Sequence, residues 1–198
     1  ARKIEGSAKT FFHNAGLVDH DDRKGTKLVV KAFSKVKNPD LRLIIRMQQK
    51  YTLPFVDPRI EIRICNLKKP FELYQEGDTA IQPSRMEGLG FMVLEPVCCG
   101  LPVITTDAPP MNEYVCQPEM RIRPQIIKRK SFAYRFASIK HAYLTSPNVS
   151  NLAKSIDWCS RNNLASTSQT NRNWAVRKFD KKTIKKQWLD AINQFFSA

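Results

Sequence analysis

The chain has 198 residues, 42% of them hydrophobic, and a formal net charge of +15 from 33 Lys and Arg against 18 Asp and Glu. This composition provides the core of a single domain and excludes a disordered basic tail. No apolar run approaches the ~20 residues of a membrane-spanning helix, and no signal-peptide pattern opens the chain. The first residue is not Met, so we expect a fragment of a longer protein.

The positive charge is concentrated in the last part of the chain. Residues 1–120 carry 17 Lys and Arg against 15 Asp and Glu, whereas residues 121–198 carry 16 against 3, a net charge of +13. Such a surface indicates an anionic partner, which could be nucleic acid, an anionic membrane or a phosphorylated substrate. A solvated basic face is the equally good alternative.

The five cysteines form no CxxC pair, so neither a zinc site nor a disulfide framework is expected. We predict reduced, mostly buried thiols in a cytoplasmic protein. The three histidines lack metal-ligand spacing, and Asp19-His20-Asp21, although it spells D-x-D, lies where acidic residues commonly precede a helix. We therefore expect no metal site.

The first two thirds of the chain alternate between strand-like and helix-like segments. Period-two or continuously apolar patterns predict strands over residues 9–14, 41–47, 59–65, 79–82 and 101–105. Helical spacing predicts helices over residues 25–37, 70–76, 89–99, 150–162, 169–178 and 181–196. Residues 117–147 show no clear pattern.

This alternation predicts a Rossmann-like α/β fold, with a parallel sheet flanked by helices on both sides and a helical C-terminal segment. Ligands of such sheets bind beyond the carboxyl ends of the strands. The loops at residues 14–25, 63–69 and 83–90 are therefore the candidate ligand-binding segments.

The segment PSRMEGLGFMVLE, residues 83–95, carries the most chemical information. Glu87 stands in a turn, and Glu95 lies eight positions later, a little over two helical turns. Gly88 and Gly90 allow the backbone to approach a ligand closely, and a helix N-terminus offers N–H donors to a diphosphate. Carboxylates beside it can accept hydrogen bonds from sugar hydroxyls.

These residues resemble the E-x7-E motif of the GT-B retaining glycosyltransferases, in particular family 4. The segment CGLPVITTDAPPMNE, residues 99–113, resembles the stretch that comes after the motif in that family, and Arg23-Lys24-Gly25 resembles the Lys-Gly that opens the first helix. The resemblance spans residues 8–116 and is closest over residues 83–113.

The resemblance implies a role for each matching residue. Glu87 would hold the hydroxyls of the donor sugar, and Lys24 would stabilise the departing diphosphate; these two are the implied catalytic residues. Glu95 would bind the ribose hydroxyls. Two further segments would complete the donor site. One is the backbone of Gly88, Leu89, Gly90, Phe91 and Met92. The other is the end of the third strand, where Arg63 would pack on the nucleotide base and Ile64 and Cys65 would read the edge of the base.

The sequence departs from the family pattern after the first strand. Many members have Gly-Arg there, whereas this chain has His13-Asn14-Ala15-Gly16, with Val18 about where the arginine would stand. Gly16 would keep the close backbone approach, and Arg23 would supply the second positive charge.

The resemblance therefore implies the C-terminal, nucleotide-sugar-binding half of a retaining hexosyltransferase, residues 1–198 forming one domain. The donor would be a UDP-sugar, no metal would be needed, and the acceptor hydroxyl of a glycan or lipid-linked sugar would bind an absent N-terminal half. We expect this domain to bind the donor without transferring the sugar. We also expect the protein to lie in the cytoplasm, at the surface of an anionic membrane. The alternative is a non-enzymatic basic module that binds nucleic acid or another polyanion through its tail and these aromatic residues: Phe132, Tyr134, Phe136, Trp174 and Trp188.

Overall fold

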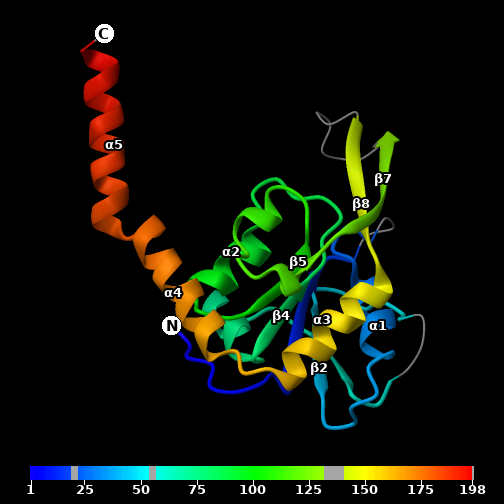
Figure 1. Ribbon diagram of the computed structural model, residues 1–198. Coiled ribbons are helices and arrows are strands. Elements are labelled where there is room, and N and C mark those ends of the chain that lie inside the picture. Colours follow the sequence, from blue (N-terminus) through cyan, green and yellow to red (C-terminus); the bar gives the residue numbers. More distant parts are fainter. Residues whose placement is uncertain (19–21, 54–56, 132–140, 198) are drawn as a thin grey trace.

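A six-stranded sheet, in which every neighbouring pair is parallel, forms the centre of the computed structural model (Figure 1). The structure describes residues 1–18, 22–53, 57–131 and 141–197, with the side chains of residues 126–131 and 141–143 left out. The strand order is β3-β2-β1-β4-β5-β6. The strands are β1 (Thr10–Gly16), β2 (Arg42–Met47), β3 (Ile60–Ile64), β4 (Thr79–Gln82), β5 (Val103–Thr106) and β6 (Arg121–Ile122). The predicted parallel, Rossmann-like sheet is confirmed.

Burial explains why the central strands β1, β4 and β5 carry no acidic or basic side chain other than the buried His13. Every residue of β4 and β5 is buried, and Phe11 and Phe12 of β1 are at most 1% exposed. Strands covered on both faces have this character, because neither side of the pleat meets water. The edge strand β3 instead alternates, and Ile62 and Ile64 on it remain exposed.

Helices cover both faces of the sheet. They are α1 (Thr26–Phe33), α2 (Phe91–Cys98), α3 (Val149–Arg161), α4 (Ala165–Phe179) and α5 (Lys181–Phe196), with short 3-10 helices η1 (Pro70–Gln75), η2 (Met111–Glu113) and η3 (Pro118–Met120). α1 packs with α3, and α2 packs with α4. Since the chain crosses the sheet in opposite directions from β1 to β2 and from β4 to β5, right-handed crossovers place α1 and α2 on opposite faces.

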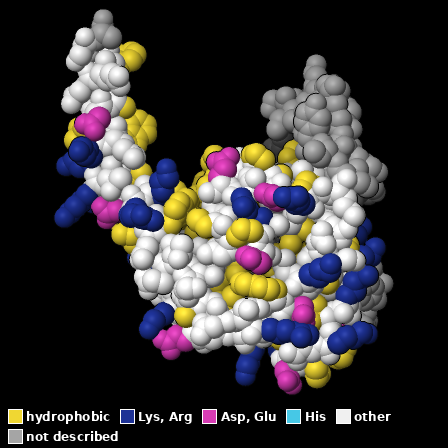
Figure 2. Space-filling view, in the orientation of Figure 1, with side chains coloured by type: hydrophobic (Ala, Val, Ile, Leu, Met, Phe, Trp, Pro, Cys, Tyr) yellow, Lys and Arg dark blue, Asp and Glu magenta, His cyan; other side chains and the backbone are white. Residues whose placement is uncertain are grey.

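The C-terminal helices confirm the predicted helical segment, although α4 begins four residues before the predicted residue 169. α5 has the predicted bounds, and it buries none of its residues. It projects away from the body (Figure 1), and Figure 2 shows Lys and hydrophobic side chains together along it. No helix in the described ranges is long and apolar enough to cross a bilayer.

An antiparallel hairpin occupies the segment that showed no sequence pattern. It consists of β7 (Pro124–Ser131) and β8 (His141–Pro147). The base of the hairpin is tied to the loop after β4, because the Thr145 N–H and hydroxyl both donate to the Arg85 carbonyl at 2.9 Å. Of the aromatic residues in the alternative function, Phe132, Tyr134 and Phe136 lie outside the described residues.

The expectation of mostly buried thiols is wrong. All five cysteines are free, but only Cys159 is buried, while Cys65 and Cys116 are exposed and Cys98 and Cys99 are half-buried. Cys65 follows the edge strand β3, where Ile64 is also exposed, and Cys116 is exposed although its neighbour Val115 is buried, so apolar sequence neighbours do not ensure burial of a cysteine.

Candidate functional site

Glu87 lies between two cations at the carboxyl end of β4. Its side chain is 9% exposed, and its Oε1 accepts a hydrogen bond from Lys24 Nζ at 2.5 Å. Its Oε2 lies 3.1 Å from Arg23 Nη1. Burial alone would raise the pKa of Glu87, but the charges of Lys24 and Arg23 outweigh it and hold that pKa below its ordinary value. The site therefore contains a fixed carboxylate flanked by two positive charges.

The turn before α1 brings Lys24 and Arg23 to Glu87. The Asp22 carboxylate accepts hydrogen bonds from the N–H groups of Thr26 at 2.7 Å and Lys27 at 2.9 Å, which satisfies donors at the start of α1. Gly25 has φ 74, and a Cβ there would stand 2.6 Å from the Pro83 carbonyl oxygen. Only glycine allows the turn to lie this close to the end of β4.

The N-terminus of α2 lines a pocket beside this carboxylate. The pocket has a volume of about 330 Å³, and it is lined by Lys24, Glu87, Leu89, Gly90, Phe91 and Met92. Gly90 adopts φ 67 just before the helix, and the first N–H groups of a helix have no partner within it. Gly88 has open space where a Cβ would lie. The start of α2, Lys24 and Glu87 thus line one pocket.

The remaining predicted donor residues lie outside this pocket. Glu95 is exposed further along α2, and its Oε2 accepts a hydrogen bond from the Tyr74 hydroxyl. Sequence reasoning missed Tyr74, which is buried in η1; no spacing rule relates it to a residue 21 positions away. Asn14 Nδ2 donates to Met92 Sδ at 2.8 Å and so joins the end of β1 to α2.

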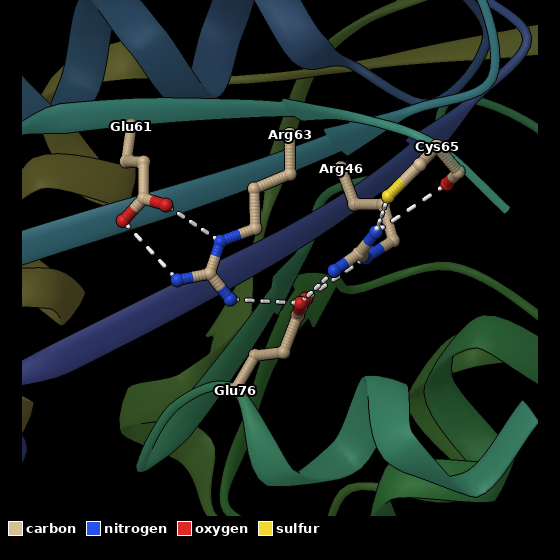
Figure 3. A network of polar contacts seen from close by, with 5 residues as sticks. All are labelled: Arg46, Glu61, Arg63, Cys65 and Glu76. Atoms are coloured by element: carbon tan, nitrogen blue, oxygen red, sulfur yellow. Dashed lines mark hydrogen bonds and ion pairs between the residues drawn. The ribbon is translucent and has the colours of Figure 1, made fainter. Parts of the chain in front are cut away.

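Arg63 is held in a network of ion pairs at the end of β3 (Figure 3). Its Nε donates to Glu61 Oε1 at 2.7 Å, and its Nη1 lies 3.0 Å from Glu76 Oε1. Glu76 also pairs with Arg46, whose Nη1 is 3.0 Å from Cys65 Sγ. The guanidinium of Arg63 is thus engaged by two carboxylates, while Ile64 and Cys65 after it are exposed.

The end of β1 and the residues just after it include Gly16 and Val18, two positions that the sequence analysis singled out. Gly16 has φ 57 and open space around it, Leu17 is 61% exposed and Val18 is buried. Arg23, further along the chain, is the residue that brings a second positive charge to Glu87. Asp19, His20 and Asp21 lie outside the described residues.

No metal site is found in the described residues, where no three His, Cys, Asp or Glu side chains cluster. His13 is fully buried; its Nδ1 is 2.7 Å from the Ile81 carbonyl and its Nε2 is 3.0 Å from the Thr26 hydroxyl. Burial lowers its pKa to about 4, so the imidazole is neutral at pH 7 and joins β1, β4 and α1.

A parallel sheet flanked by helices, with a pocket at the N-terminus of α2, defines a Rossmann-like α/β domain. The sequence matches the family model described as glycosyl transferases group 1 over residues 9–135. The chain belongs to this family, and its fold is that of the C-terminal domain of a GT-B glycosyltransferase. A comparison with curated protein sequences gives no match.

Solved structures share this fold at low sequence identity. A glycosyltransferase from Rickettsia africae aligns with TM-score 0.66 and 15% identity over 94% of this chain and 48% of its own. The C-terminal domain of the group 1 protein LpcC from Francisella tularensis aligns with TM-score 0.58 and 19% identity over 90% of this chain and 89% of its own. S. aureus TarM, in complex with fondaparinux, alpha-GlcNAc-glycerol and UDP, aligns with TM-score 0.64 and 16% identity over 96% of this chain and 36% of its own. The chain thus spans less than half the length of the first and third.

Proposed function

We propose that residues 1–198 form the donor-binding domain of a retaining glycosyltransferase that uses a UDP-hexose. The observation that carries this proposal is Glu87, a nearly buried carboxylate held by Lys24 and Arg23 beside the N-terminus of α2. A carboxylate accepts hydrogen bonds from sugar hydroxyls, and a helix N-terminus with a nearby cation binds a diphosphate. One pocket can therefore bind both the sugar and the diphosphate of a nucleotide sugar.

In this proposal the diphosphate lies against the backbone of residues 88–92 and the Lys24 ammonium. As the bond from sugar to diphosphate breaks, negative charge grows on the leaving oxygen, and a pre-placed cation stabilises that charge without reorganisation. Glu87 holds the sugar hydroxyls, and Arg23 adds the second positive charge. Lys24 and Arg23 would stabilise the negative charge of the leaving diphosphate, which a metal ion stabilises in other enzymes. We therefore propose metal-independent transfer.

The nucleoside would extend from α2 across the sheet toward β3. β3 is three strand positions from β4, roughly 14 Å at the usual strand spacing, which suits an extended ligand. Glu95 would bind the ribose hydroxyls, and the exposed backbone at Ile64 and Cys65 would read the base. Because the Arg63 guanidinium is paired, we propose that only its aliphatic stem contacts the base, while Gly16 allows close approach at β1.

The whole enzyme would contain an N-terminal half that binds the acceptor, a hydroxyl of a glycan or lipid-linked sugar. The S. aureus neighbour, in complex with UDP, supports the choice of nucleotide. This domain alone would bind donor without transferring the sugar.

The deciding experiment is calorimetric titration of the chain with UDP, with GDP and ADP for comparison. We expect UDP to bind, and Glu95→Ala to weaken the binding about tenfold or more, because a hydrogen bond to a charged group contributes about 1.5–3 kcal/mol. The proposal fails if none of the three nucleotides binds. If the chain binds DNA or RNA in a salt-dependent way and binds none of the three nucleotides, the result supports the alternative polyanion-binding module.

A cytoplasmic place at an anionic membrane belongs to the same proposal. Its support is the net charge of +13 in residues 121–198, together with α5, where four lysines accompany the exposed Trp188 and Phe195. Trp174 of the same tail contributes less, since its ring packs on Tyr114 and Phe179. Liposome co-sedimentation with no preference for anionic lipid would remove the membrane from the proposal.

A further inference from the structure

Tyr74 places a hydroxyl donor directly on Glu95. The side chain belongs to η1, the short helix that leads to β4, and the residue is 7% exposed. Its hydroxyl donates to Glu95 Oε2. Burial and the neighbouring Glu95 charge raise the pKa of Tyr74, so the hydroxyl keeps its proton at neutral pH and acts as a donor.

Packing on β1 fixes the position of the Tyr74 ring. The ring meets Phe12 edge to face, with centroids 6.5 Å apart and planes at 64°, and Phe12 itself is 1% exposed. Leu73, next to it in η1, is also buried. A side chain locked in this way loses little further entropy when it orients a neighbour.

Glu95 needs such support because of its location. It lies on the exposed side of α2, and in the described part of the chain Tyr74 is the one hydrogen-bond partner of its carboxylate. An exposed glutamate otherwise samples several rotamers and loses that freedom on binding. With Tyr74 on Oε2, the chemistry of a carboxylate still leaves Oε1 and one lone pair of Oε2 for two hydroxyl donors.

We infer that Tyr74 is a positioning residue that holds the Glu95 carboxylate ready for the vicinal 2′- and 3′-hydroxyls of a ribose. The inference rests on the proposed function, because it deepens the role of Glu95 at the nucleoside end of the donor site. Tyr74 acts through Glu95, so its contribution depends on the presence of the ribose hydroxyls in the ligand.

The test compares Tyr74→Phe with the unchanged chain for two ligands, UDP and 2′,3′-dideoxy-UDP. We expect Tyr74→Phe to weaken UDP binding about 3- to 10-fold, and to change the binding of the dideoxy ligand less than twofold. A purely structural role would weaken both ligands equally, so the difference between the two ratios isolates positioning. The phenylalanine keeps the ring against Phe12, and thermal unfolding of the variant verifies that the fold is retained.

Tyr51→Phe is the matched control, since it removes a hydroxyl from a ring that contacts Lys27 and leaves Glu95 untouched. It should leave both affinities unchanged. Equal losses for both ligands in Tyr74→Phe, or no loss for UDP while Glu95→Ala still weakens it, would overturn the inference alone. A chain that binds no nucleotide would instead refute the proposed function, so the two failures are distinguishable.

Discussion

Replacing Lys24 by methionine should weaken the binding of UDP by about 10- to 100-fold. The Lys24 side chain is 15% exposed and lines the pocket, where a diphosphate would meet it beside the first turn of α2. A charge-assisted hydrogen bond contributes about 1.5–3 kcal/mol, and every 1.4 kcal/mol is tenfold in affinity. Isothermal titration of the two proteins with UDP measures the difference.

The ligand provides one control for this prediction, and α1 provides another. Uridine lacks both phosphates, so its affinity should be the same for Lys24→Met as for the unchanged chain. Lys31→Met removes the same charge from an exposed position on α1, the helix that follows Lys24, and should leave UDP binding within twofold. If Lys24→Met and Lys31→Met behave alike, Lys24 does not contact the diphosphate.

Loss of Lys24 should also lower stability, and this effect must be separated from binding. Glu87 would keep its ion pair with Arg23, at 3.1 Å, but lose the shorter ion pair, with Lys24, while remaining nearly buried. A buried carboxylate with less compensation is costly, so the free energy of unfolding should fall. Titrations at a temperature well below both unfolding midpoints compare folded proteins only.

Lys24 and Glu87 could be predicted to lie near each other because each belongs to a loop that follows a strand predicted from the sequence. Lys24 and Glu87 are 63 residues apart, yet each follows a strand whose apolar run is legible, and both strands end at the same edge of the sheet. The glycines at 25 and 90 mark turns with positive φ that only a few residues tolerate. Strand order and turn chemistry together bring the two loops into contact.

The same reasoning fails where side chains, not backbone, decide the contact. Glu76 joins Arg46 to Arg63, and Tyr74 reaches Glu95, across different elements. Among many charged and aromatic residues, no periodicity shows which pair will meet. The prediction of a base-packing Arg63 therefore did not include the two carboxylates that hold its guanidinium.

The hairpin of β7 and β8 escaped prediction for a local reason. Residues 124–131 read PQIIKRKS, a charged run with neither strict alternation nor one of the Gly or Asn turn pairs that mark short hairpins.

The start of α2 also differs from the predicted helix boundary, for a local reason. α2 begins at Phe91 and not at the predicted Leu89, because Gly90 takes the left-handed conformation and forms the turn before the helix.

Gly25→Ala should lower the free energy of unfolding by about 2–4 kcal/mol. The new Cβ would require positive φ from a non-glycine residue, which costs about 1 kcal/mol, and it would stand 2.6 Å from a backbone oxygen of Pro83. Forcing extra volume into a tightly packed contact costs typically ~1–3 kcal/mol more, since neither backbone segment can rotate away. Urea unfolding followed by circular dichroism measures the sum.

Gly16→Ala separates the two contributions. Gly16 has a similar positive φ, 57 against 74, but no heavy atom lies within 4 Å of the position that a Cβ would take. It should therefore lose only about 1 kcal/mol from the backbone conformation. If the two variants unfold at the same urea concentration, the contact with Pro83 relaxes freely and does not hold the turn. If Gly25→Ala loses clearly more, the close approach of the α1 turn to the end of β4 is rigid and does not relax to admit a Cβ.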